Sequence, residues 1–242
     1  MQAEIGISKH LGGFPATRQL LDLCHIEVAS EVLDVGCGIG VGPAYIARTH
    51  DCHVVAVDLS PKMIEWARRR VREEGVEDRV ELLVADVLEL PFEADRFDVV
   101  VAESVLAFVD DKPRAIQELV RVTKPGGYVG LNEFVWLGEM PDDVVQLTHD
   151  LGTLVLGAEG WRAAMDGSGL RDQVVKTRRL DPMVELRSRM RWIGLRWMVR
   201  AWGRALLLLA TRPEIRRLYK TVASGAGKAF DSSGYGLFVG RK

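Results

Sequence analysis

One stretch, residues 31–42 (EVLDVGCGIGVG), constrains the fold more than any other part of this 242-residue chain. Val32, Leu33 and Val35 form an apolar run, typical of a strand that is buried on both faces of a parallel sheet. Alternating glycines follow, and then a helix-compatible segment, 43–48. This order indicates a nucleotide-type site, because glycine lets a ligand approach the main chain and the helix start offers free N–H groups.

Two details of the glycine stretch indicate which ligand it suits. The dinucleotide fingerprint G-x-G-x-x-G, begun at Gly36 and Gly38, requires a third glycine where the chain has Val41. Asp34 would repel a pyrophosphate, whereas a carboxylate there suits a ligand with an ammonium group and a sulfonium. An NAD-dependent oxidoreductase is therefore the disfavoured alternative.

The same residues strongly resemble the first motif, D/E-x-G-x-G-x-G, of the class I S-adenosylmethionine (SAM)-dependent methyltransferases, here of the small-molecule, type 11 kind. Asp34, Gly36, Gly38 and Gly40 fill the motif, and Cys37 lies inside it. The resemblance implies that these residues contact the cofactor SAM and that S-adenosyl-L-homocysteine is the product.

Further strand-like and helix-like segments predict the fold class. Strands are expected at 32–35, 53–57, 80–84, 97–101, 128–134, 170–177 and 234–239, and helices at 16–26, 62–74, 112–122 and 161–168. The alternation predicts an α/β fold: a Rossmann-like, seven-stranded, mostly parallel sheet with helices on both faces. We expect an N-terminal lid and helix (1–30), a SAM-binding core (31–180), a helical insertion or cap (181–230) and a final core strand (231–242).

Acidic residues follow several of these strands, at the sheet edge where open α/β sheets bind ligands. Asp58 ends the second strand, 18 residues beyond Gly40, where a carboxylate can accept hydrogen bonds from both ribose hydroxyls. Its alternative role is to cap the next helix. Ser60 followed by Pro61 is the better helix start, so Asp58 is left for the ligand.

The family resemblance implies further cofactor contacts. Leu59 and Met63 would flank the adenine, although Met63 also suits a core position. Asp86 would meet the exocyclic amine of adenine, with a solvated loop carboxylate as its alternative, and Val87 would donate its backbone N–H. Glu103 would lie by the methionine moiety and the methyl group.

The sequence offers fewer candidates for binding the acceptor or moving a proton than for binding the cofactor. A base is needed only if the acceptor is a hydroxyl, an acidic carbon or a protonated amine. The candidates by position are His10, Glu103, Glu133 and His149, the last of which also reads as an exposed helical residue. Asn132 and Trp136 near the end of the fifth strand are expected acceptor contacts, and the resemblance adds His10 and Thr17.

The segment 187–209 combines tryptophans, leucines and arginines. Six apolar residues fall on one helical face and four arginines on an adjacent one: Trp192, Leu195, Val199, Trp202, Leu206 and Leu209, then Arg189, Arg196, Arg200 and Arg204. Three interpretations stay open: a packed helix with solvated arginines, a cap over the acceptor pocket, or a peripheral membrane contact.

The net charge differs between the two parts of the chain. Residues 1–170 hold 15 Lys/Arg against 29 Asp/Glu, whereas residues 171–242 hold 17 Lys/Arg against 5 Asp/Glu.

Composition narrows the partners. The three cysteines, Cys24, Cys37 and Cys52, lack metal-ligand spacing, and no signal peptide or long apolar run is visible. We therefore expect no metal and a cytoplasmic protein, with a peripheral location at the inner face of the membrane left open. No nucleic-acid-binding module is recognisable at a net charge of −2.

The predicted function is methyl transfer from SAM to a small, apolar or amphipathic acceptor, such as a quinol, lipid, terpenoid or amine-type metabolite. The chain lacks the N/D-P-P-[FYW] signature of amino-group DNA and glutamine methyltransferases. A catalytically inactive SAM-binding or membrane-associated protein is the non-enzyme alternative. Neither the acceptor atom nor the oligomeric state follows from the sequence.

Overall fold

The computed structural model describes residues 11–138, 142, 145–146, 155–213, 216 and 232–242. Its strands are β1 (Glu31–Val35), β2 (His53–Asp58), β3 (Val80–Val84), β4 (Phe97–Glu103), β5 (Thr123–Trp136), β6 (Leu156–Gly157), β7 (Arg171–Arg179) and β8 (Ser233–Arg241). Its helices are α2 (Gly13–Leu23), α3 (Val41–His50), α4 (Pro61–Glu73), the 3-10 turn η1 (Leu106–Phe108), α5 (Lys112–Val122), α7 (Ala158–Asp166), α8 (Pro182–Ile193) and α9 (Leu195–Thr211).

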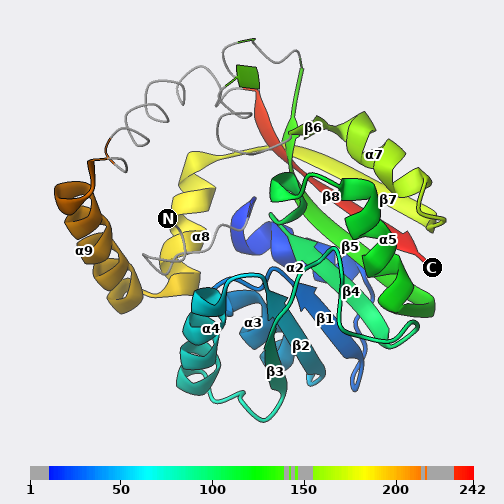
Figure 1. Cartoon of the computed structure of the whole chain (residues 1–242), viewed down its shortest axis with the longest axis horizontal. Coiled ribbons are helices and arrows are strands. Elements are labelled where there is room, and N and C mark those ends of the chain that lie inside the picture. Colours follow the sequence, from blue (N-terminus) through cyan, green and yellow to red (C-terminus); the bar gives the residue numbers. More distant parts are fainter. Residues whose placement is uncertain (1–10, 139–141, 143–144, 147–154, 214–215, 217–231) are drawn as a thin grey trace.

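The strands form one sheet in the order β3-β2-β1-β4-β5-β8-β7 (Figure 1). β8 runs antiparallel to β5 and β7, and the pairs on the other side of β5 are parallel. The predicted α/β fold with a mostly parallel sheet is therefore confirmed. Over the described residues the sheet has eight strands instead of the expected seven, because the two-residue β6 pairs with β5 and is too short to leave a pattern in the sequence.

Alternating residues of the central strands feed two separate cores. Val32, Val54 and Val99 pack in the cluster that contains α2, α3 and α4. Leu33 and Val55, one residue along, pack in the cluster that contains α5 and α7. Both faces of the sheet are covered, which explains why these strands read as continuous apolar runs.

The starts of α4 and α5 follow the expected capping chemistry. Ser60 caps α4 by accepting a hydrogen bond from the Met63 amide, with Pro61 in the first turn. Asp111 caps α5 through the Arg114 amide at 3.0 Å. The prediction that Ser60 rather than Asp58 begins α4 is thus confirmed, and the sheet edge beyond β2 is left for other contacts.

Several predicted bounds were wrong. The helix expected at 16–26 begins at Gly13 and ends at Leu23, because His25 has a positive φ of 49° that ends the helix. The strands expected at 97–101 and 128–134 extend to Glu103 and over Thr123–Trp136.

The helical segment before the last strand was also predicted incorrectly. The pattern suggested one helix over 187–209, but Gly194 (φ 81°) separates α8 from α9. The face expected to pack is turned outward: Val199, Trp202 and Leu206 are more than half exposed. Trp197, Met198 and Ala201 of α9 are buried instead. The predicted domain limits themselves stay a prediction.

Candidate functional site

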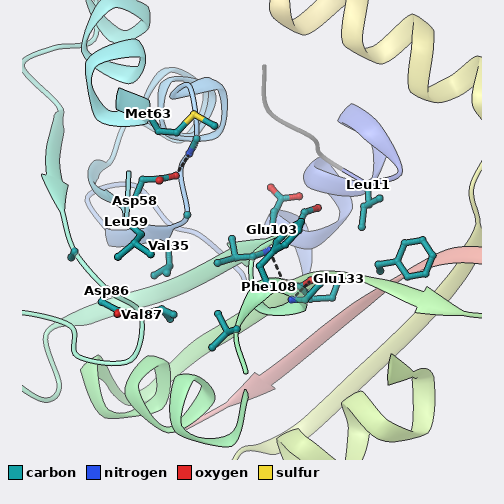
Figure 2. A pocket seen from close by; sticks show the side chains of 18 of the residues that line it. Leu11, Val35, Asp58, Leu59, Met63, Asp86, Val87, Glu103, Phe108 and Glu133 are labelled. Atoms are coloured by element: carbon teal, nitrogen blue, oxygen red, sulfur yellow. Dashed lines mark hydrogen bonds between the residues drawn. The ribbon is translucent and has the colours of Figure 1, made fainter. Parts of the chain in front are cut away.

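A cavity of about 480 Å³ opens beyond the carboxyl ends of β1, β2, β4 and β5 (Figure 2). This lies within the ~300–1,000 Å³ typical of small-molecule sites. Figure 2 shows two opposed walls. The β1–β3 wall comprises Val35, Gly36, Gly38, Asp58, Leu59, Met63, Ala85, Asp86 and Val87. The β4–β5 wall comprises Leu11, Glu103, Ser104, Val105, Ala107, Phe108, Val109, Glu133, Phe134 and Val155.

The glycine turn of the β1–β3 wall is tied to β2. The amides of Gly36 and Cys37 both donate to the carbonyl of Val57, at 2.7 and 2.9 Å. Gly36 has a φ of 75°, and a Cβ built there would lie 2.1 Å from a methyl carbon of Val105. The turn therefore requires glycine. These two amides are used by the neighbouring strand, and the expectation of free N–H groups concerned the start of the following helix.

Asp58 connects the end of β2 to that turn. Its Oδ2 accepts the Gly38 amide at 3.0 Å and its Oδ1 accepts the Ser60 amide at 2.9 Å. Burial raises the pKa of the Asp58 carboxyl, and the two backbone hydrogen bonds oppose that shift. A carboxylate oxygen can accept more than one hydrogen bond, so both oxygens can still accept from a ligand at the cavity wall.

The other predicted contacts of this wall are also placed at the cavity. Leu59 is 68% exposed although it is a large apolar residue, and Met63 lies above it on α4 (Figure 2). Asp86 is exposed and accepts the Leu88 amide at 2.9 Å, while Val87 is buried against the second core. An apolar flank between two carboxylates suits a flat heteroaromatic ring that carries an amine and is joined to a sugar with hydroxyls.

Glu103 anchors the opposite wall. Its Oε2 accepts hydrogen bonds from Thr17 Oγ1 (2.8 Å) and Asn132 Nδ2 (2.9 Å). The Asn132 amide group also donates to the carbonyl of Leu11 at 2.9 Å. The structure thus brings Thr17, Asn132 and Glu103 together in a buried network, with Glu103 alone of the three at the cavity wall.

Glu133 is fully buried beneath η1. Its carboxylate accepts the amides of Val105, Leu106 and Ala107 at 2.9, 2.7 and 3.4 Å. Burial raises the pKa of the Glu133 carboxyl to about 7, against these hydrogen bonds and the nearby charge of Lys112. These contacts favour a role in holding η1 at the cavity over the predicted role as a base.

Some predicted site residues do not reach the cavity wall. Trp136 is buried beside Phe134, two residues earlier on the same strand, and Phe134 rather than Trp136 is among the described residues that line the cavity. Asp34, Cys37 and Gly40 are buried and are not among the described residues that line the cavity. Burial also raises the pKa of the Cys37 thiol, mostly through desolvation. His10 and His149 lie outside the described residues.

The sequence reasoning missed the segment after β4. Ser104 has a φ of 61°, a conformation that is unusual for serine, and its buried Oγ has no hydrogen-bond partner among the described residues. Val105, Phe108 and Val109 line the cavity beside it. The apolar residues 105–109 (VLAFV) follow neither helical nor strand periodicity. Only their position after the end of a strand could have indicated the site.

Comparison with known proteins agrees with this geometry. Residues 33–131 match the family model described as a methyltransferase domain. The chain is 35% identical over 138 residues to "Methyltransferase GfsG" of Streptomyces halstedii, which covers 57% of this chain and 50% of that protein. It is 36% identical over 123 residues to "Phosphoethanolamine N-methyltransferase 1" of Triticum aestivum, covering 51% and 24%. The chain thus spans half or less of the length of these curated relatives.

Solved structures share the fold over nearly the whole chain. The [4+2]-cyclase SpnF has a TM-score of 0.79 at 21% identity, covering 98% of this chain and 89% of that one. A geranyl diphosphate methyltransferase in complex with SAM has a TM-score of 0.67 at 21% identity, covering 94% and 84%. At such identities the likeness concerns the fold alone.

Proposed function

Because the chain carries a class I SAM-dependent methyltransferase domain, we propose that it transfers a methyl group from SAM to a small, apolar or amphipathic acceptor. The observation that carries the proposal is the cavity with two different walls. One wall offers carboxylates and apolar side chains suited to an adenosine, and the other faces it with an apolar surface and Glu103.

The β1–β3 wall would hold SAM. Asp58 would accept hydrogen bonds from the ribose hydroxyls, and Leu59 and Met63 would enclose the adenine. Asp86 would meet the exocyclic amine of the adenine, next to the backbone of Val87. The fit is supported by the exposed Leu59, because an apolar side chain on a cavity wall gains when a ring covers it.

When bound, SAM supplies a methyl group on an already activated sulfonium. The chain's own task is to align the acceptor with that methyl group and to exclude water, which is worth roughly 7–11 kcal/mol for well-oriented reactants. Glu103 is at the wall where a hydroxyl or amine proton could be accepted. Thr17 and Asn132 would keep its carboxylate in place.

Calorimetry with SAM, S-adenosylhomocysteine and NAD tests the cofactor assignment. We expect binding of SAM and its demethylated product and no binding of NAD. Binding of NAD without SAM would instead favour the oxidoreductase alternative. A protein that binds SAM yet forms no S-adenosylhomocysteine with any of the quinols, sterols, phospholipids, amines and thiols tested would fit the inactive SAM-binding alternative.

We also propose that α9 contacts an anionic membrane surface. Val199, Trp202 and Leu206 lie outward on α9 at spacings of three and four, and Leu207 is similarly exposed. Residues 186–213 contain seven arginines and no acidic residue, a charge that complements anionic lipid. None of the helices in the described part of the chain is long and apolar enough to span a bilayer. Flotation with vesicles tests this contact.

A further inference from the structure

A small apolar cluster joins α9 to the wall proposed to hold SAM. Its buried members are Ile39 and Val41 at the glycine turn and the start of α3, Met63 on α4, and Trp197 and Met198 on α9. All five side chains are at most 8% exposed. The cluster is separate from the two cores that cover the faces of the sheet. The start of α9 lies beside α4 (Figure 1), so α9 packs on the cofactor wall.

Met63 belongs to the cavity wall and to this cluster at once. It lines the cavity beside Leu59, and it shares the cluster with Trp197 and Met198. Because methionine is unbranched and has several rotatable bonds, its position depends on what packs against it. A flexible side chain that is to flank an adenine therefore needs support, and α9 supplies part of that support.

The glycine turn is joined to the same support. Ile39 follows Gly38, which lines the cavity and donates its amide to Asp58 at 3.0 Å. Gly40 has a φ of 80°, and a Cβ built there would lie 2.8 Å from the Cα of Ala67 on α4. The turn and α4 are therefore in direct contact, and a shift of α4 would also move the turn.

Two tryptophans and two arginines hold α9 against α4. The rings of Trp66 and Trp197 meet edge to face, with their centroids 5.5 Å apart. The guanidinium of Arg70 on α4 lies 4.5 Å from the centroid of the Trp197 ring, and that of Arg204 on α9 lies 4.6 Å from the centroid of the Trp66 ring. Each helix thus places an arginine over a tryptophan of the other helix. Such contacts are directional, so they fix the orientation of α9 as well as its distance from α4.

We propose that Trp197 and Met198 are positioning residues of the SAM site, which hold Met63 and, through α4, the glycine turn where an adenosine requires them. The proposal rests on the methyl-transfer function proposed above, since it takes SAM as the ligand of this wall. Neither Trp197 nor Met198 is among the described residues that line the cavity, so both act on the cofactor through other side chains. The inner face of α9 thereby takes part in cofactor binding.

Calorimetric titration of S-adenosylhomocysteine into the full chain tests the proposal. Trp197→Ala and Met198→Ala should each weaken binding about threefold to thirtyfold. Met190→Ala is the matched control, because Met190 is 45% exposed on α8, and its affinity should stay within about twofold of the wild type. Wild-type affinity in both α9 variants overturns the proposal, as does an equal loss in Met190→Ala. Failure of the wild type to bind S-adenosylhomocysteine would instead contradict the proposed function.

The same titrations distinguish lost position from lost folding. A variant that does not fold lowers the number of sites per chain, whereas a misplaced Met63 lowers the affinity of the sites that remain. Trp197→Phe keeps an aromatic ring between α4 and α9 and should recover most of the affinity lost in Trp197→Ala.

A double variant tests the route through Met63. In a Met63→Ala background, Trp197→Ala should cause a smaller further loss of affinity than it causes in the wild type, because the side chain through which it acts is already gone. Full additivity of the two losses would contradict the proposal, and so would fewer sites at wild-type affinity in Trp197→Ala.

Discussion

At the scale of single residues, Asp58 is the most direct test of the cofactor site. Replacing it with alanine removes the predicted hydrogen bonds to the ribose and the acceptors for the Gly38 and Ser60 amides. SAM affinity should fall by about 1–3 kcal/mol, measured by calorimetry. Asp58→Asn should lose less, and Asp78→Ala, at an exposed position, serves as the matched control. Wild-type affinity in Asp58→Ala would show that the ribose lies elsewhere.

Glu133 gives a prediction about pH. Its folded-state pKa of about 7 lies above the ordinary 4.5, so the folded state binds the proton more tightly than the unfolded state does. The stability from this group is complete below about pH 4.5 and is lost as the pH rises through 7. Across that window the free energy of unfolding of the wild type should fall by about 3 kcal/mol relative to Glu133→Gln. Denaturant unfolding at several pH values measures it, and parallel curves for the two proteins would contradict it.

The cofactor wall was more predictable from the sequence than the acceptor wall. Asp58 and Glu103 are the last residues of β2 and β4 and Asp86 follows β3, and the carboxyl ends of parallel strands meet at one edge of the sheet. Ser104, Val105 and Phe108 could not be identified in this way, because their placement depends on the amides that Glu133 holds. That contact joins two segments distant in sequence, and no local pattern encodes it.

At the scale of elements, the break between α8 and α9 depends on one backbone conformation. Gly194 has φ 81° and ψ 144°, a region that other residues rarely adopt, and a Cβ there would meet open space. Gly194→Ala should therefore cost roughly 1–3 kcal/mol of stability through strain alone. Gly203, inside α9 and also without neighbours at its Cβ, is the matched control. Gly203→Ala should stabilise by about 0.5–1 kcal/mol.

The comparison is made by denaturant unfolding of both variants. Stabilisation by Gly194→Ala would mean that α8 and α9 can join into one helix, as the sequence pattern alone suggested. The glycine was a visible signal for a break, and the apolar spacing around it concealed that signal. Elements of the sheet were easier, because buried parallel strands are short, apolar and bounded by glycine or acidic residues.

The contact of α9 with the core was not predictable from the pattern of α9 itself. Trp197 and Met198 pack with Met63 on α4 and with Ile39 and Val41. The guanidinium of Arg204, expected on a solvated face, lies 4.6 Å from the Trp66 ring centroid. The side of α9 that packs inward is the one that contacts α4, where Met63 and Trp66 lie. α9 thus packs against Met63, a residue of the predicted adenine site.

At the scale of the whole molecule, the excess of basic residues in 171–242 and the exposed apolar side chains of α9 predict membrane binding. The protein should float with vesicles of anionic lipid at low salt, bind less as salt rises, and not float with zwitterionic vesicles. Trp202→Ser should weaken flotation. Val28→Ser, an exposed apolar residue outside α9, is the control. No binding of the wild type to anionic vesicles at low salt would remove the proposal.

The place of β8 also bears on how the protein is made. The strand comes last in sequence but lies between β5 and β7, so the sheet cannot close until residue 241 has left the ribosome. At about 5–20 residues per second, the hundred or so residues after β5 take roughly 5–20 s to be translated. During that delay the nascent chain carries an open seam beside β5, where a chaperone or a second unfinished copy could bind.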